Sequence, residues 1–168
     1  YAPGDTDLSW ARTTVWRALC AAAFDSVSVP ARAGTVTGAA GDPARALVAG
    51  WLAACLGIEV ALADGGGHGI GAVSIELEDG AIGITQAGRA TALLTSTGQP
   101  DRTMPLEPMA LGDLLAEELR RLDADETYAR ALGQATGSGD LSGRSDTRTH
   151  VWHDPTGSTD PDPALTTT

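Results

Sequence analysis

The sequence has 168 residues, enough for about one domain, and carries 11 basic residues against 22 acidic ones, a formal net charge of -11. A phosphate backbone or an anionic membrane surface would repel this charge, and no basic stripe gathers the arginines. No apolar run approaches the roughly 20 residues that cross a bilayer, and no signal peptide opens the chain. We therefore expect no nucleic-acid or membrane partner and predict a soluble, cytoplasmic protein.

Apolar residues are unevenly distributed along the chain. Residues 133–168 contain only three of the 32 Leu, Ile, Val and Phe residues, too few to offset the entropy of ordering that segment. We predict a linker over 1–7, one α+β domain over 8–135 and a disordered acidic tail over 136–168. The start at Tyr1 and the use of arginine without lysine suggest a piece of a longer protein from a GC-rich bacterial genome.

The first predicted element is an amphipathic helix over residues 8–24, which Asp7 is placed to cap. Two tryptophans and two arginines crowd its first turns, namely Trp10, Arg12, Trp16 and Arg17. Tryptophan and arginine are enriched in interface hot spots, so these side chains form either a partner surface or a part of the core with capping contacts. In the first case, Trp10→Ala combined with Arg17→Ala would weaken partner binding and leave the fold intact.

A strand-helix-strand segment follows. A short β-prone stretch covers 35–39, and Asp42-Pro43 supplies an N-cap and a first-turn proline for a helix that ends at Gly57. Alternating apolar residues then predict a strand over 58–62 with one buried face. Strand, helix and strand in this order imply a right-handed parallel crossover.

A β-hairpin is predicted next, around the two-residue turn Asp79-Gly80, because both turn positions need positive φ. Counting back from this turn places four apolar side chains together on one buried face. The expected pairs are Leu77 with Ile82 and Ile75 with Ile84.

The rest of the body predicts two more strands and two helices. The strands cover 90–95 and 103–106, with a turn at 98–101 between them. Leucines recur at helical spacing from Leu111 to Leu122, and Asp123 to Glu126 matches a capping box for a last helix.

Alternation in the strands predicts the fold class, because an all-parallel sheet would instead show continuous apolar runs. We predict a single α+β domain with a mixed, mainly antiparallel sheet of five or six strands and helices on one face. A small doubly wound sheet with helices on both faces is the alternative.

The sequence gives little support for a redox-active pair or a metal site. Cys20 and Cys55 fall on the apolar faces of predicted helices, so we expect two buried thiols, with a redox pair as the alternative. His150, His153 and Asp154 are spaced like metal ligands, but three ligands in a disordered tail fall short of the four of a structural zinc site. We therefore expect no metal and no other cofactor.

The glycine-rich stretch 65–71 is a candidate for ligand binding, because closely spaced glycines let backbone N–H groups approach an anion. A strand follows it, however, and neither a Rossmann nor a Walker motif is complete. No nucleophile or carboxylate is spaced to make His68 a general base, so no catalytic residue is predicted. The stretch is either a flexible connection or part of an anion site formed by Gly66, Gly67, His68, Gly69 and Arg102.

Four sequence blocks stand in order at residues 1–19, 66–71, 98–102 and 115–123. The first begins Tyr-Ala-Pro-Gly-Asp-Thr-Asp-Leu-Ser-Trp, and the last reads Leu-Ala-Glu-Glu-Leu-Arg-Arg-Leu-Asp. Together they resemble the C-terminal half of the OpcA-type glucose-6-phosphate dehydrogenase assembly protein family. The N-terminal half of that family has no counterpart here, and the tail after residue 133 matches nothing in it.

The resemblance implies a non-catalytic accessory protein that binds and activates glucose-6-phosphate dehydrogenase, at the entry to the oxidative pentose phosphate pathway. It supplies no catalytic residues and no oligomeric state. We expect the first helix to contribute to the contact through its tryptophans and arginines. The alternative is a sugar-phosphate-binding protein or enzyme that uses the glycine-rich loop.

Overall fold

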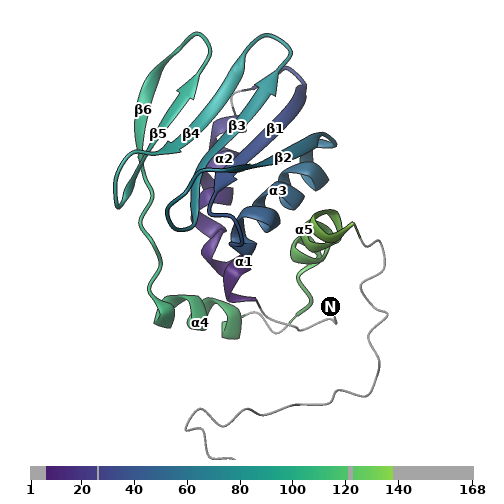
Figure 1. The fold of residues 1–168 in the computed structure, drawn as a ribbon, viewed down its shortest axis with the longest axis vertical. Helices are drawn as coiled ribbons and strands as arrows, with labels where there is room; N and C mark the ends of the chain where they lie inside the picture. Colours follow the sequence, from purple (N-terminus) through teal and green to yellow (C-terminus); the bar gives the residue numbers. More distant parts are fainter. Residues whose placement is uncertain (1–6, 26, 121–122, 138–168) are drawn as a thin grey trace, which may run out of the picture.

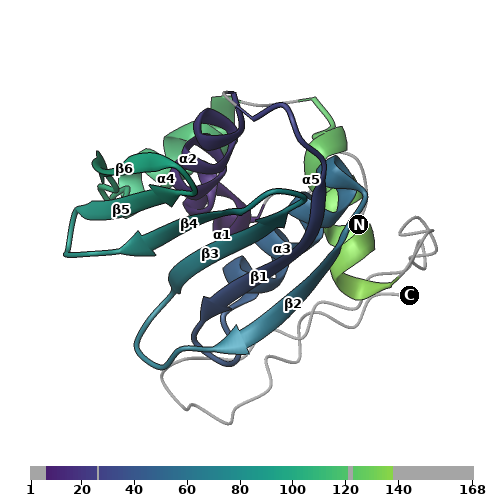
Figure 2. The ribbon, with the colours of Figure 1, turned by 90° about the horizontal axis from the view of Figure 1, so that it is seen from above.

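The structure, a computed structural model, describes residues 7–25, 27–120 and 123–137. Within these ranges six strands form one sheet, and five helices lie on one side of it (Figure 1; Figure 2). The strands are β1 (Ala31–Gly38), β2 (Glu59–Asp64), β3 (Ile70–Leu77), β4 (Ala81–Gln86), β5 (Thr91–Ser96) and β6 (Gln99–Pro105). The helices are α1 (Leu8–Arg12), α2 (Thr14–Phe24), α3 (Pro43–Leu56), α4 (Leu111–Arg120) and α5 (Glu126–Thr136).

The strand order in the sheet is β2-β1-β3-β4-β5-β6. β1 and β2 are parallel and are joined through α3, whereas every other neighbouring pair is antiparallel. Arg45 of α3 donates from Nη1 to the carbonyl oxygens of Gly38 (3.2 Å) and Ala63 (2.9 Å), which ties the carboxyl ends of the two parallel strands together. The predicted α+β class, with a mixed and mainly antiparallel sheet, is confirmed.

The single helix predicted over 8–24 is wrong, because the chain forms two helices that meet at Thr13. Thr13 is fully buried, and its backbone N–H and its Oγ1 donate to the carbonyl oxygen of Trp10 at 2.9 and 2.7 Å. These bonds close α1 after five residues and turn the chain before α2 begins. Asp7 caps α1 as predicted, since its Oδ1 accepts from the Ser9 N–H at 2.8 Å.

The predicted register of the β3–β4 hairpin is wrong by two residues, because Glu78 and Asp79 form the turn. Gly80 has no positive φ, and a Cβ there would stand 2.5 Å from the side chain of Thr97. Glycine is therefore required by a close approach and not by the turn conformation. The buried face is the predicted one, since a shift of two residues leaves each side chain on its face. The observed pairs are Ile75 with Ile82 and Val73 with Ile84.

Strands β1 and β6 each begin four residues earlier than predicted. β1 begins at Ala31, ahead of the β-prone stretch, because it is paired on both sides by β2 and β3. β6 begins at Gln99, so Pro100 belongs to a strand and not to the turn predicted at 98–101. Proline is tolerated there because β6 is an edge strand. Gly98, at φ +75, makes the turn instead.

The helix ends follow the predicted signals at α3 but not at α5. Asp42 caps α3, and Gly57 ends it in the left-handed conformation, at φ +66. The N-cap of α5 is Asp125 and not Asp123, because Asp125 Oδ1 accepts from the Tyr128 N–H at 2.9 Å. The capping box predicted from Asp123 is therefore wrong.

The main core lies between the sheet and helices α2 and α3. β2 forms the other edge of the sheet, and Leu62 is 49% exposed there, so the buried face predicted for 58–62 is incomplete. A smaller apolar cluster joins α1, α3 and α5 and consists of Trp10, Leu47, Tyr128 and Ala131. No helix in the described ranges is both long and apolar enough to span a membrane.

Candidate functional site

The four residues predicted as a partner surface separate into two places. Trp10 is 3% exposed and lies in the small cluster, where its Nε1 donates to Asp125 Oδ2 at 2.9 Å. The ring centroid of Trp10 lies 5.5 Å from that of Tyr128. The Cζ of Arg17 lies over the Trp10 ring, 3.7 Å from its centroid. Of the two alternatives, the structure shows core packing for Trp10. Because Trp10 is buried, we expect Trp10→Ala with Arg17→Ala to destabilise the fold and not to leave it intact.

Arg12 and Trp16 instead line a pocket of about 190 Å³ beside the junction of α1 and α2. His68 and Gly69 of the glycine-rich loop line the same pocket, and so does Arg89 of the β4–β5 loop. The fold thus brings two members of the predicted interface together with two members of the predicted anion loop.

Asp42 holds Arg12 at the rim of this pocket. The Nη2 of Arg12 donates to Asp42 Oδ1 at 2.9 Å, and the same oxygen accepts from the Ala44 N–H at 3.1 Å. Because the Arg12 side chain is 49% exposed, solvent screens this ion pair, which contributes less than about 1 kcal/mol to stability. The ion pair instead fixes the position of Arg12, because it directs the guanidinium toward the first turn of α3.

Arg89 and Glu107 face the pocket from neighbouring chain segments. The Leu106 N–H donates to the carbonyl oxygen of Ala90 at 2.9 Å, which ties the two segments together, and Leu106 itself is buried. Within the described ranges neither Arg89 nor Glu107 has an ion-pair partner. The pocket therefore presents one unpaired cation and one unpaired carboxylate.

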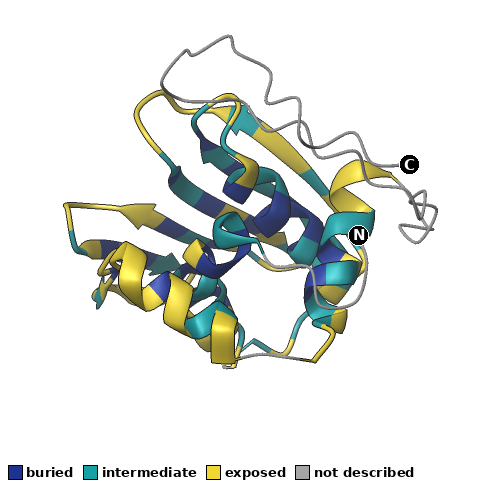
Figure 3. Ribbon diagram, turned by 90° about the horizontal axis from the view of Figure 1, so that it is seen from below, coloured by how far each residue is buried: buried dark blue, intermediate teal, exposed yellow. Residues whose placement is uncertain are grey.

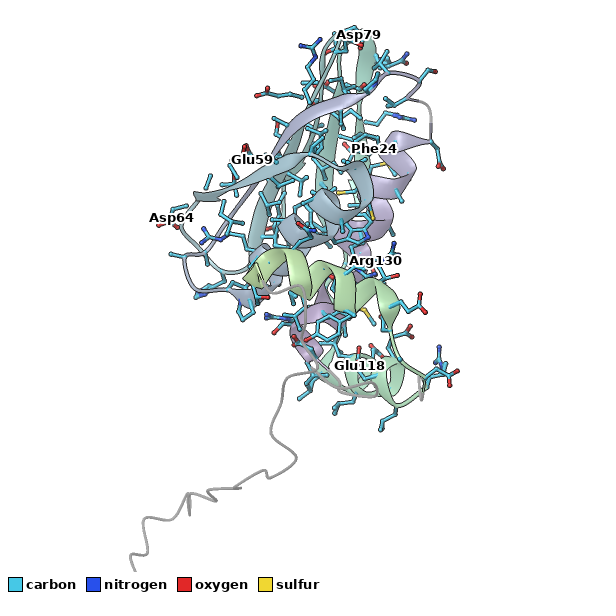
Figure 4. The ribbon with its side chains drawn as sticks, turned by 90° about the vertical axis from the view of Figure 1, so that its right-hand side faces the viewer. Phe24, Glu59, Asp64, Asp79, Glu118 and Arg130 are labelled. Atoms are coloured by element: carbon cyan, nitrogen blue, oxygen red, sulfur yellow. The ribbon has the colours of Figure 1, made fainter. Side chains whose placement is uncertain are left out.

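Gly66, Gly67 and Arg102 do not line this pocket. Both glycines have positive φ, +64 and +72, with open space where a Cβ would stand. Arg102 lines a separate hollow that includes Asp79. Figure 4 shows Asp79, and with it this hollow, at the opposite end of the described structure from Glu118 of α4. The predicted anion site is thus assembled only in part.

Sequence reasoning missed Arg89 and Glu107. Neither residue belongs to a motif, and they are 18 positions apart in the chain. The pairing of β5 with β6 brings their segments together, and that pairing was predicted. A search for charged residues flanking paired strands would have found them, although nothing in their residue type distinguishes them from other charged loop residues.

The outer face of α4 is the second exposed feature. Leu111, Leu115 and Leu119 are spaced four residues apart and are 62%, 44% and 74% exposed, and we call them the leucine stripe. Leu114 is the only leucine of α4 that is buried in the described structure, and α4 packs on α1. Figure 3 shows the exposed surface along this helix. The regular leucine spacing therefore does not mark a buried face here.

The two cysteines differ in environment, and both are free thiols. Cys20 is buried in α2, and burial raises the pKa of its thiol from 9.0 to about 12, because the thiolate would be desolvated. Cys55 of α3 is exposed, so the expectation of two buried thiols is wrong for this residue.

Alkylation at pH 8 is expected to label Cys55 rapidly and Cys20 only after unfolding, because the thiolate is the reactive form. Mass spectrometry of the native and the urea-unfolded chain, each treated briefly with iodoacetamide, measures this. Equal labelling of the two cysteines in the native chain would contradict the burial of Cys20.

Within the described residues no group of three or more metal-ligating side chains lies together. The candidate ligands His150, His153 and Asp154, and the predicted tail from 138 onward, lie outside the described residues, as do residues 1–6 of the predicted linker.

A family model described as the C-terminal domain of a glucose-6-phosphate dehydrogenase subunit matches residues 3–132. The matched range includes every residue that lines the pocket and the whole leucine stripe. No curated protein and no solved structure matches the chain.

Proposed function

Because the chain belongs to the family of C-terminal domains of glucose-6-phosphate dehydrogenase subunits, we propose that it is a non-catalytic accessory module that binds this dehydrogenase and raises its activity. The family match over residues 3–132 carries the proposal. The partner is then a bacterial, cytoplasmic enzyme of the oxidative pentose phosphate pathway, as the sequence resemblance implies.

The environment of His68 supports a non-catalytic role. His68 is exposed, and within the described ranges its side chain has no hydrogen bond to a carboxylate or to a nucleophile. A general base needs such a partner within reach of the reacting group.

The leucine stripe is the surface that we assign to the contact. Trp10 and Trp16 are buried, so the first helices do not offer aromatic anchors to a partner. Of the four exposed large apolar side chains in the described structure, three belong to the stripe. An amphipathic helix with apolar residues at four-residue spacing fits a hydrophobic groove, and each leucine that becomes fully buried contributes about 1.5–3 kcal/mol.

The acidic charge of the chain indicates which kind of groove on the dehydrogenase would fit the stripe. Glu118 lies next to the stripe on α4, whereas Asp113 and Glu117 lie on the opposite side of this helix, and the whole chain carries a net charge of -11. The complementary surface is an apolar groove on the dehydrogenase with lysine or arginine at its rim, because matched potentials favour association.

Replacement of the whole stripe, Leu111→Gln, Leu115→Gln and Leu119→Gln, is expected to weaken binding to the dehydrogenase at least about ten-fold. Glutamine keeps the helix propensity of leucine and removes the apolar surface. Co-elution on size exclusion measures binding, and the rate of NADPH formation measures activation. The matched control is Leu62→Gln, which replaces the exposed leucine of β2 and should change neither readout.

Two outcomes would count against this assignment. If the parent chain neither co-elutes with the dehydrogenase nor changes its rate, association through this module is rejected. If the parent chain binds and the triple variant binds equally well, association stands and the contact lies on another surface. Circular dichroism of each variant establishes that its fold is retained.

A further inference from the structure

We propose that the pocket between α1, α2 and the β4–β5 loop binds a small phosphorylated sugar. The proposal goes beyond association with the dehydrogenase and does not depend on it, because the cavity lies within this chain alone. Its walls come from segments far apart in the sequence, around residues 12–16, 42–44, 68–70, 86–89 and 106–109.

The basic side chains of the pocket provide the phosphate subsite. Arg89 is exposed and has no ion-pair partner within the described ranges, so its guanidinium is available for two parallel hydrogen bonds to phosphate oxygens. Arg12 uses Nη2 for Asp42, which leaves its other N–H groups for a ligand. His68 adds a third donor from the glycine-rich loop. These groups converge in a chain with twice as many acidic as basic residues.

The other polar side chains of the pocket do not suit a bare phosphate ion. Glu107 is an unpaired carboxylate, and it would repel a bare phosphate held by Arg89 in the same pocket. A ligand with hydroxyl groups resolves this conflict, because hydroxyls donate to the carboxylate while the phosphate is kept near the arginines. Gln86 also lines the pocket; its Nε2 donates to the carbonyl oxygen of Gly88 at 3.2 Å, and its amide oxygen is a further acceptor for a hydroxyl.

The apolar wall also fits a sugar. Trp16, Val15 and Met109 line the pocket together with the charged groups. Apolar side chains against the C–H groups of a sugar, with polar groups around its hydroxyls, remove both parts of the ligand from water without leaving either unsatisfied.

Size and position narrow the ligand class further. The volume of about 190 Å³ is below the roughly 300–1,000 Å³ of drug-sized sites, which suits a monosaccharide phosphate and not a dinucleotide. The pocket also borders the first turn of α3, which follows the carboxyl end of β1. Ligands of sheets with parallel crossovers bind at such ends. The carboxylate of Asp42 already caps the first turn of α3, so the phosphate is assigned to the arginines and not to this helix end.

Isothermal titration of the full chain with glucose 6-phosphate, glucose and inorganic phosphate tests the proposal. Glucose 6-phosphate is expected to bind most tightly of the three. Arg89→Gln should weaken its binding at least about ten-fold, because a charge-assisted bidentate contact is lost. The matched control is Arg102→Gln, since Arg102 is also an exposed arginine without an ion-pair partner in the described structure, but lies in the other hollow.

Glu107→Gln separates the two halves of the site. It should weaken binding of glucose 6-phosphate and leave binding of inorganic phosphate unchanged or stronger, because the variant replaces one of the two acceptor oxygens by an NH2 donor and removes a repulsive charge. The proposal is overturned if glucose 6-phosphate shows no saturable binding at millimolar concentration, if inorganic phosphate or glucose binds as tightly, or if Arg102→Gln weakens binding as much as Arg89→Gln. Retained circular dichroism spectra show that each variant is folded.

Discussion

Trp10→Ala is expected to lower the free energy of unfolding by about 3–5 kcal/mol, the loss typical of truncating a buried aromatic side chain. Trp10 is 3% exposed and connects α1 to α5 through its ring contact with Tyr128 and its hydrogen bond to Asp125. The Tyr128 hydroxyl donates to Asp7 Oδ2 at 3.0 Å, so the N-cap of α1 is also connected to this cluster. Such a loss is a large share of a typical domain stability of about 5–15 kcal/mol.

Urea unfolding followed by circular dichroism measures this effect, with Trp10→Phe as the matched variant. Phenylalanine keeps a ring in the cluster and removes the N–H donor, so it should lose about 1.5–3 kcal/mol, the contribution of a hydrogen bond to a charged group. Asp125 still accepts from the Tyr128 N–H in that variant. A Trp10→Ala chain as stable as the parent would mean that the side chain is not buried.

The same substitution bears on both proposed surfaces, the leucine stripe and the pocket. Arg12 lies two residues after Trp10 in the same short helix, and α4 packs on that helix. Loss of Trp10 should therefore weaken dehydrogenase binding and ligand binding together, as an indirect effect of unfolding. Only the variants of exposed residues, Arg89 and the leucine stripe, separate the two functions.

Gly50→Ala is expected to destabilise the chain by about 1–3 kcal/mol, the cost of overpacking a well-packed contact. A Cβ at this position in α3 would overlap the carbonyl oxygen of Ala131, and would stand 2.9 Å from the backbone N of Ala135. Both atoms belong to the backbone of α5, so relief requires the helices to separate. Glycine thus sets how closely α5 packs on α3.

Gly112→Ala is the matched control, because Gly112 is also helical and no atom lies within 4 Å of the place that a Cβ would take. Alanine exceeds glycine in helix propensity by about 1 kcal/mol, so this variant should be neutral or stabilised. Thermal unfolding compares the two. If Gly50→Ala raises the melting temperature as Gly112→Ala does, α5 is not docked on α3 at this distance.

Local signals in the sequence predicted the elements whose cause is local. Asp42, Pro43 and Gly57 bound α3 as predicted, because a cap, a first-turn proline and a left-handed glycine act through neighbouring backbone groups. Alternation likewise predicted a mainly antiparallel sheet with one polar face, since the period of two depends only on the strand itself. The four sequence blocks identified the family, which the match over residues 3–132 confirms.

Contacts between segments far apart in the sequence decided the features that the sequence predicted wrongly. Thr13 breaks the first helix from a buried position, and Asp125 replaces Asp123 as a cap while it also accepts from Trp10. Gly80 carries a turn signal but serves a close approach by Thr97, which lies in the turn between β5 and β6. Each outcome depends on a partner that no local window contains.

The two proposed surfaces also combine features that the sequence predicted with features that only packing decided. Amphipathic spacing in the sequence identified α4 as a helix, yet only packing on α1 decided that Leu114 is buried and that the leucine stripe faces outward. Residue type alone marked Arg12 and His68 as candidates, but the meeting of these residues with Arg89 and Glu107 required the whole sheet. The sequence by itself determined the ends of α3, the mainly antiparallel fold class, the family and the charge, because these depend on composition and near neighbours. The tertiary structure alone decided which side chains share a pocket, because that depends on register and on helix packing across the entire chain.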